Sequence, residues 1–188
     1  MALDPAEFDR VLAQAKRGAP WALSVLYREF NPPIRRYLLA RVPVDGEDLA
    51  ADVWLAAAPK IPAFEGDMVG FRAWLFTFAR RRAIDHGRRE RRQGGPPGTL
   101  QEIHQRSTSD DPAAEALERV SATEAAQLVA SHLTPEQSDV VLLRVLAGLE
   151  VDQVAATLGR PETWVRVTQH RALRRLARRL GSQIGVTR

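Results

Sequence analysis

The chain has 188 residues, of which 45% are apolar and 27% charged, with a net charge of +4 and no cysteine. This length can form one ordinary domain or two small ones, and the lack of cysteine excludes disulfides, thiolate metal sites and cysteine nucleophiles. The N-terminus has no signal-peptide core and no apolar run is long enough to cross a membrane, so we expect a cytoplasmic protein without membrane insertion.

The charge is divided into blocks along the chain. Residues 71–92 carry a net charge of +6, and residues 160–180 carry the same net charge. The segments 1–70, 93–133 and 134–159 are each net negative. Because every neutralised phosphate releases counterions, two basic blocks indicate nucleic acid as the partner. The alternative is a helical protein whose arginine-rich faces are simply solvated.

The N-terminal part of the chain shows helical periodicity and no convincing strand. The expected helices cover residues 8–15, 21–30, 34–42 and 47–58. The second and third are either separate or one helix kinked at Pro32 and Pro33. Residues 60–70, with their Gly and Pro, predict a loop.

The next helix is predicted over residues 71–92 and has two different halves. Apolar side chains in its first half recur at the spacing of one buried helical face. Its second half carries arginines that project outward, and Asp85 shares a face with Arg81, Arg88 and Arg92 as an expected ion-pair partner. The first half therefore anchors the helix and the second half presents positive charge.

The remainder of the chain predicts a linker followed by a helix-turn-helix. Residues 93–112 are rich in Gly, Pro, Ser, Thr and Asp and predict a flexible linker. A helix is expected over residues 113–133, and "TPEQ" at residues 134–137 is a helix start with a capping box. A short helix over Val151–Leu158, a turn at Gly159 and a longer helix up to Leu180 complete the motif. The prediction is an all-α protein with two small helical domains, 1–92 and 113–188, joined by the linker.

The longer helix of this motif has one packed face and one free face. The packed face is predicted from the helical spacing of Val165, Ala172, Leu173, Leu176 and Leu180. The free face, which would enter the major groove, comprises Thr163, Arg166, Val167, His170, Arg171 and Arg174. Arg166 can donate two hydrogen bonds to a guanine edge and Val167 can contact a thymine methyl, whereas the later arginines would meet phosphates.

Two segments carry a family resemblance. "FRAWLFTFARRRAIDHGRRERR" resembles the second conserved region, and "LTPEQSDVVLLRVLAGLEVDQVAATLGRPETWVRVTQHRALRRL" the fourth, of bacterial sigma factors of the extracytoplasmic-function (ECF) group of the sigma-70 family. The resemblance implies a factor that binds core RNA polymerase and directs promoter-specific transcription initiation by recognising the −35 element and melting the −10 element. It implies no enzymatic activity, no cofactor and no metal.

The resemblance also implies which surfaces meet the polymerase. Asp45, Asp48 and Asp52 form an acidic stripe that would dock on the clamp helices of the polymerase β′ subunit, while the C-terminal domain would contact the β flap. Acids at a helix start also complement the helix dipole, which is the simpler reading of Asp45 taken alone. Many relatives are held inactive by an anti-sigma factor, so such a partner is expected too.

For the −10 element, the resemblance implies that Phe64 stacks an unpaired base, as aromatic rings do in single-strand binding. Trp74 and Phe78 are expected in the core. The arginines that would hold the DNA backbone are Arg80, Arg81, Arg82, Arg88, Arg89 and Arg92.

Two other function classes are compatible with parts of the sequence. A helix-turn-helix regulator that acts without polymerase would use only the C-terminal domain. A metal-dependent phosphohydrolase could use Asp85 and His86, although the other histidines are isolated from them in the sequence.

Overall fold

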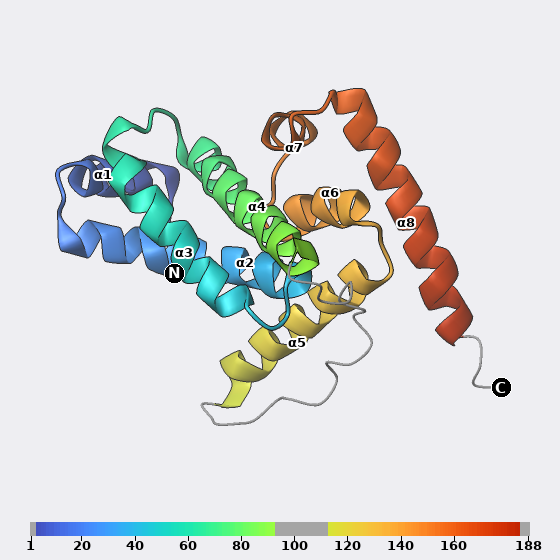
Figure 1. Cartoon of the computed structure of the whole chain (residues 1–188). Coiled ribbons are helices and arrows are strands. Elements are labelled where there is room, and N and C mark those ends of the chain that lie inside the picture. Colours follow the sequence, from blue (N-terminus) through green and yellow to red (C-terminus); the bar gives the residue numbers. More distant parts are fainter. Residues whose placement is uncertain (1–2, 93–112, 185–188) are drawn as a thin grey trace.

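The computed structural model describes residues 3–92 and 113–184, with side chains described for 3–92 and 122–179. Every regular element in these ranges is a helix, as predicted (Figure 1). The elements are α1 (Pro5–Lys16), α2 (Pro20–Arg41), α3 (Gly46–Ala57), the 3₁₀ helix η1 (Ala58–Ala63), α4 (Met68–Arg92), α5 (Ala113–Ser131), α6 (Pro135–Val145), α7 (Val151–Leu158) and α8 (Glu162–Ile184). The predicted linker, residues 93–112, lies outside the described residues.

The sequence left open whether residues 21–42 form two helices or one helix kinked at Pro32 and Pro33. The structure has a single helix, α2, that runs through both prolines. Each proline removes a backbone donor, which usually breaks a helix. Here both flanks bury apolar side chains: Leu26 and Phe30 before the prolines, Tyr37 after them. Packing on both sides keeps the two parts in one helix.

The predicted loop over residues 60–70 is only partly a loop. Its first residues belong to η1, and α4 already begins at Met68 rather than at Phe71. The cause is Asp67, whose Oδ1 accepts a hydrogen bond from the Gly70 amide at 2.7 Å. A side chain that satisfies a free amide in the first turn starts a helix, and Asp67 was not recognised as a cap in the sequence.

Helix α6 begins and helix α7 begins and ends where the local signals predict, whereas α8 runs to Ile184, past the predicted end at Leu180. The Thr134 hydroxyl accepts from the Gln137 amide, and the Gln137 side chain accepts from the Thr134 amide, so the capping box is confirmed. Helix α7 ends at Leu158 and is capped by Gly159, which has a φ of 62°. This left-handed conformation suits glycine because it has no Cβ, and it turns the chain into α8.

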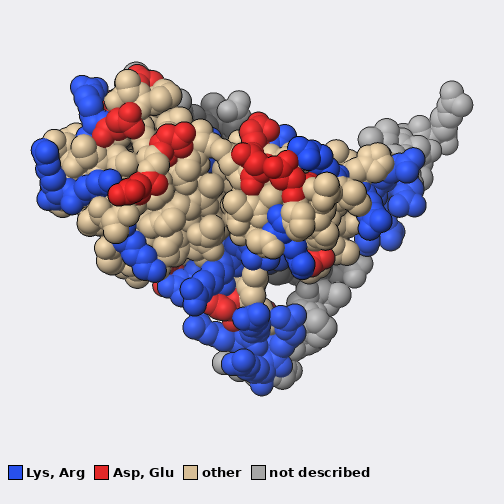
Figure 2. All heavy atoms as spheres, turned by 90° about the horizontal axis from the view of Figure 1, so that it is seen from above, with Lys and Arg blue, Asp and Glu red and all other residues tan. Residues whose placement is uncertain are grey.

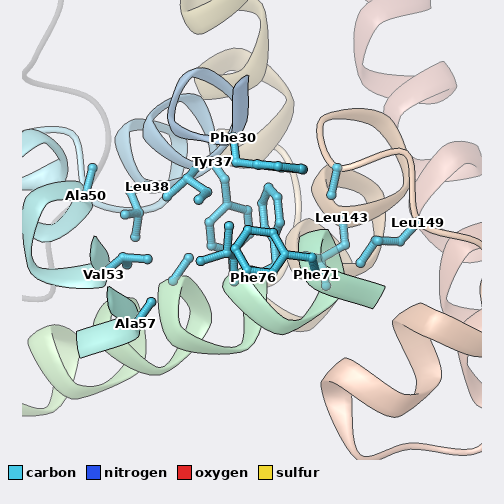
Figure 3. Packing of buried hydrophobic residues seen from close by; sticks show 14 of the residues in the cluster. Phe30, Tyr37, Leu38, Ala50, Val53, Ala57, Phe71, Phe76, Leu143 and Leu149 are labelled. Atoms are coloured by element: carbon cyan, nitrogen blue, oxygen red, sulfur yellow. The ribbon is translucent and has the colours of Figure 1, made fainter. Parts of the chain in front are cut away.

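The N-terminal half (residues 3–92) and the C-terminal half (residues 113–184) pack against each other. Helix α5 lies along α2 and α7 lies against α4, whereas α8 lies on the far side of α6 and α7 (Figure 1). The buried side chains form one continuous cluster, in which Leu143 and Leu149 lie beside Phe30 and Phe71 (Figure 3). The structure therefore has a shared core between its two halves.

In the described residues, no helix combines the length and the apolar character that crossing a membrane requires.

Candidate nucleic-acid interface

Helix α8 presents its predicted free face to solvent. Val165 and Ala172 are fully buried and Leu176 nearly so, against α6 and α7. All six side chains of the free face are exposed: Thr163, Arg166, Val167, His170, Arg171 and Arg174. An exposed helix face with arginines near the helix-turn-helix corner has the form of a major-groove reader.

The prediction of the packed face is wrong for one residue, Leu173. Leu173 is 51% exposed. It follows Val165 by eight positions, which places it about 80° around the helix from Val165, at the edge of the face and beyond the reach of α6 and α7. The side chain of Leu180 lies outside the described residues.

In α4, the basic second half projects as the sequence predicted. Arg81, Arg88, Arg89 and Arg92 are exposed and Arg82 is half-buried. Asp85 lies 3.8 Å from both Arg81 and Arg88, which confirms the predicted ion pairing. Pairs this open contribute little to stability, so these guanidinium groups remain able to bind phosphate.

Arg80 is placed differently from the other arginines of α4. Its Nε donates to Asp139 Oδ2 at 3.2 Å, across the contact between the two halves. Its side chain is 30% exposed, against 81% for Arg81. Arg80 is therefore engaged within the protein in this arrangement.

Basic side chains gather in patches on the surface. Figure 2 shows Lys and Arg side chains gathered at a projecting tip of the molecule and at a separate edge, while Asp and Glu clusters lie on the body of the molecule beside other Lys and Arg side chains. Patches of one sign raise the local positive potential and attract a polyanion.

Phe64 lies in an aromatic cluster. Its ring centre is 5.1 Å from that of Phe71 and 5.3 Å from that of Trp74. The residue is 8% exposed, and a Cβ built on Gly66 would lie 3.1 Å from the tip of its ring. Phe64 is the residue expected to stack an unpaired base, and in this arrangement its ring is packed within the cluster; Trp74 beside it is half-buried.

The acidic stripe lies along α3. Asp48 is exposed, while Asp45 and Asp52 are half-buried. The carboxylate of Asp45 faces His86 of α4, with 3.4 Å between Asp45 Oδ2 and His86 Nε2. Asp45 thus also links α3 to α4, and Asp48 is the most accessible member of the stripe.

The two residues of the phosphohydrolase hypothesis have different surroundings. Asp85 faces arginines, and His86 faces the carboxylates of Asp45 and Glu90 at 3.4 and 3.5 Å. In the part of the chain that the structure describes, no group of three or more His, Cys, Asp and Glu side chains is arranged to hold a metal ion.

The sequence reasoning missed a polar cluster between the two halves. Tyr37 is fully buried and its hydroxyl donates to Asp139 Oδ1 at 2.8 Å. Burial, together with the Asp139 carboxylate, raises the pKa of Tyr37 well above its ordinary value of 10.0. The available signal was an acid within the apolar run that follows the capping box, at Asp139.

Comparison with known proteins matches both halves of the chain. The Sigma-70 region 2 family model matches residues 26–93, and the Sigma-70 region 4 model matches residues 123–176. The chain is 32% identical over 183 residues to the ECF RNA polymerase sigma factor SigD of Mycobacterium tuberculosis, covering 94% of this chain and 85% of that protein. It is 31% identical over 181 residues to the ECF RNA polymerase sigma factor BldN of Streptomyces coelicolor, covering 94% and 67%.

Among solved structures, the chain resembles CnrH in its complex with the cytosolic domain of CnrY. The TM-score is 0.62, with 92% of this chain and 96% of that chain covered at 20% sequence identity. At this level of identity the likeness concerns the fold.

Proposed function

The chain belongs to the extracytoplasmic-function group of the sigma-70 family, and we propose that its two halves carry separate parts of the function of such a factor. It is a non-enzymatic transcription initiation factor that binds core RNA polymerase and directs initiation at promoters by recognising the −35 element and melting the −10 element. The assignment to particular residues rests on one observation above all. The exposed recognition face of α8 and the arginine-ended helix α4 stand in one chain, with α6 and α7 between the two helices (Figure 1).

For the −35 element, the proposed reading residues are Thr163, Arg166, Val167, His170, Arg171 and Arg174. Arg166 is near the N-terminus of α8, where recognition helices enter the major groove, and its fork of donors matches the O6 and N7 atoms of guanine. Arg171 and Arg174 lie farther along and would contact phosphates, which contributes affinity without sequence discrimination.

For the −10 element, the proposed phosphate-binding residues are Arg80, Arg81, Arg82, Arg88, Arg89 and Arg92. Phe64 remains the proposed base-stacking residue. Because its ring is packed on Phe71, stacking on a base requires the ring to rotate out of the cluster. Trp74 is the second candidate, since it belongs to the same cluster and is more accessible.

For the polymerase, the proposed contact is the acidic stripe Asp45, Asp48 and Asp52 with the clamp helices of β′. Asp48 is exposed at the first turn of α3, and Asp52 follows one turn later on the same face. We propose that the C-terminal half contacts the β flap and that an anti-sigma factor is the regulatory partner. A protein with these partners acts in the cytoplasm.

The proposed domains are residues 1–92 for polymerase docking and the −10 element, and 113–188 for the −35 element, with 93–112 as linker. A regulator that binds DNA without polymerase would need only the second domain. This alternative function would leave the acidic stripe and the basic end of α4 without a role.

The test is run-off transcription with purified core RNA polymerase and fragments carrying the cognate promoter. The full chain should give a defined transcript that core enzyme alone does not give. Nanomolar, sequence-specific binding of the isolated chain to duplex DNA, without transcription on adding core enzyme, would instead establish the polymerase-independent regulator.

A further inference from the structure

Three side chains meet at the corner where α7 turns into α8. The guanidinium carbon of Arg160, which follows the Gly159 turn, lies 5.1 Å from the centre of the Trp164 ring, in the first turn of α8. Arg160 Nη2 also donates to Oε1 of Glu136, in the first turn of α6, at 3.4 Å. We call these three residues the Arg160 corner.

The side chain of Arg160 is held at both of its ends. Its backbone amide donates to the Ala155 carbonyl oxygen at 3.0 Å, which fixes the residue against the end of α7. The Trp164 ring that carries its guanidinium is half-buried and packs against the buried core, and a cation is attracted to the face of such a ring. Because a free side chain loses rotamer entropy when it binds a ligand, an arginine that is held in advance binds an anion at lower cost.

Most of the hydrogen-bonding capacity of Arg160 is still available. A guanidinium has five N–H donors, and in the described residues the side chain of Arg160 has a hydrogen-bond partner only at Nη2. The ion pair with Glu136 is open, with 51% of the Arg160 side chain exposed, so it contributes little to stability. The remaining donors can therefore bind an oxyanion that approaches from solvent.

The Arg160 corner lies on the side of α8 that is proposed to face DNA. Trp164 precedes Arg171 by seven residues, or nearly two turns, so the two side chains lie on the same side of the helix. Arg171 is an exposed member of the recognition face. In a helix-turn-helix the first helix crosses the DNA backbone and the N-terminal end of the second enters the major groove. The turn between them, which leads into α8 through Arg160, then lies beside the phosphates at the edge of the groove.

We propose that Arg160 binds a backbone phosphate of the DNA beside the −35 element, and that Trp164 is the positioning residue that holds its guanidinium for this contact. The inference rests on the proposed function, because it adds a contact to the proposed −35 surface. A phosphate bound at this corner fixes the register of α8 in the groove without reading a base. The planar guanidinium suits a phosphate because it can donate two parallel hydrogen bonds.

The first test is competition binding of holoenzyme, reconstituted with core RNA polymerase, to promoter fragments that carry every single substitution in the −35 element. Arg160→Gln should weaken all fragments alike by about tenfold or more, as expected for losing a charged hydrogen bond. It should also lower the slope of log affinity against log salt by about 0.9. Arg17→Gln, which removes an exposed arginine of the N-terminal half, should change neither quantity.

The phosphate itself can be located by replacing the phosphates beside the −35 element, one at a time, with neutral methylphosphonates. The parent protein should lose affinity at each contacted phosphate. At one of these positions Arg160→Gln should lose nothing further, because its contact there is already absent. If the two proteins respond alike at every position, Arg160 binds no phosphate and the proposal is wrong.

A double-mutant cycle tests the positioning role of Trp164. Trp164→Leu keeps an apolar side chain against the core but removes the ring face, and it should weaken binding about two- to fivefold, the range for an exposed cation–π contact. In the Arg160→Gln background the same change should have no effect. Equal losses in both backgrounds would overturn the positioning role. If Trp164→Leu loses helical circular dichroism, Trp164→Phe decides, because its smaller loss must also vanish in the Arg160→Gln background.

Failure of this inference can be distinguished from failure of the proposed function. A parent protein that gives no run-off transcript with core polymerase would overturn the proposed function. The Arg160 corner would then be judged on the full chain bound to duplex DNA without polymerase, where Arg160→Gln must lower the salt slope by the same amount. An unchanged slope there would overturn the phosphate contact.

Discussion

Arg166→Ala tests the assignment of the −35 reading face. In the free protein the Arg166 guanidinium donates to Glu162 Oε2 at 2.8 Å, one turn earlier in α8, with 61% of the Arg166 side chain exposed. An exposed pair at this spacing contributes only about 0.3–0.5 kcal/mol. Loss of the Arg166–Glu162 ion pair should therefore barely change the stability of the protein. A bidentate contact with guanine is worth about 1–3 kcal/mol, so the cognate −35 sequence should lose roughly 5- to 150-fold in affinity.

The assay is competition binding of reconstituted holoenzyme to promoter fragments that carry every single substitution in the −35 element. Arg166→Ala should weaken the cognate fragment and reduce discrimination at one base pair, leaving the other positions as they are. A second variant, Glu162→Gln, removes the carboxylate that competes with DNA for Arg166. The Glu162→Gln protein should bind the cognate sequence as tightly as the parent protein or more tightly.

Arg174→Ala is the matched control, since it removes an arginine from the same exposed face farther along the helix. It should weaken all fragments alike and lower the slope of log affinity against log salt by about 0.9, the value for one phosphate contact. A uniform loss across all −35 variants with Arg166→Ala would mean that Arg166 contacts the backbone, and the orientation assigned to α8 would be wrong.

Three further predictions follow from individual side chains. The pKa of Tyr37 is raised in the folded state, so its contribution to stability is complete below about pH 10 and is lost as the pH rises through the folded-state pKa, at up to about 1.4 kcal/mol per pH unit. Urea titrations above pH 10 should show this component in the parent protein and in Tyr27→Phe, whose side chain is exposed, but not in Tyr37→Phe. Phe64→Ala should impair open-complex formation more than polymerase binding. A pre-melted template that lacks the base to be captured should restore its activity, and continued inactivity there would refute the stacking role. Asp48→Asn should weaken binding to core polymerase several-fold in a salt-dependent manner, as expected for a close charge pair at an interface, whereas Asp9→Asn, an exposed acid in α1, should not. Equal effects of the two variants would argue against the acidic stripe.

Much of the C-terminal half was predictable because its signals are local. The capping box at Thr134 and the glycine at position 159 each specify the conformation of a few neighbouring residues. The free face of α8 followed from helical spacing alone. The same reasoning explains why Leu173 was wrongly predicted to be packed. Periodicity gives the direction of a side chain around the helix, but it does not say how wide a part of the helix the neighbouring helices cover.

The N-terminal half depended more on tertiary packing. Periodicity could not decide whether the prolines divide α2, because the outcome rests on what Phe30 and Tyr37 pack against. The burial of the Phe64 ring could not be predicted from the sequence for the same reason. The rings that pack on it, those of Phe71 and Trp74, belong to the helix that follows. These contacts are between elements, and a pattern within one element does not contain them.

The two proposed DNA-binding surfaces differ in how free they are in this arrangement. Arg80 of α4 is paired with Asp139, whereas the recognition face of α8 is exposed, because α8 lies on the far side of α6 and α7 from the N-terminal half (Figure 1). Duplex recognition by α8 therefore does not depend on a movement of the N-terminal half. The exposed arginines of this face supply a contact whose affinity should fall steeply with salt, as phosphate contacts do.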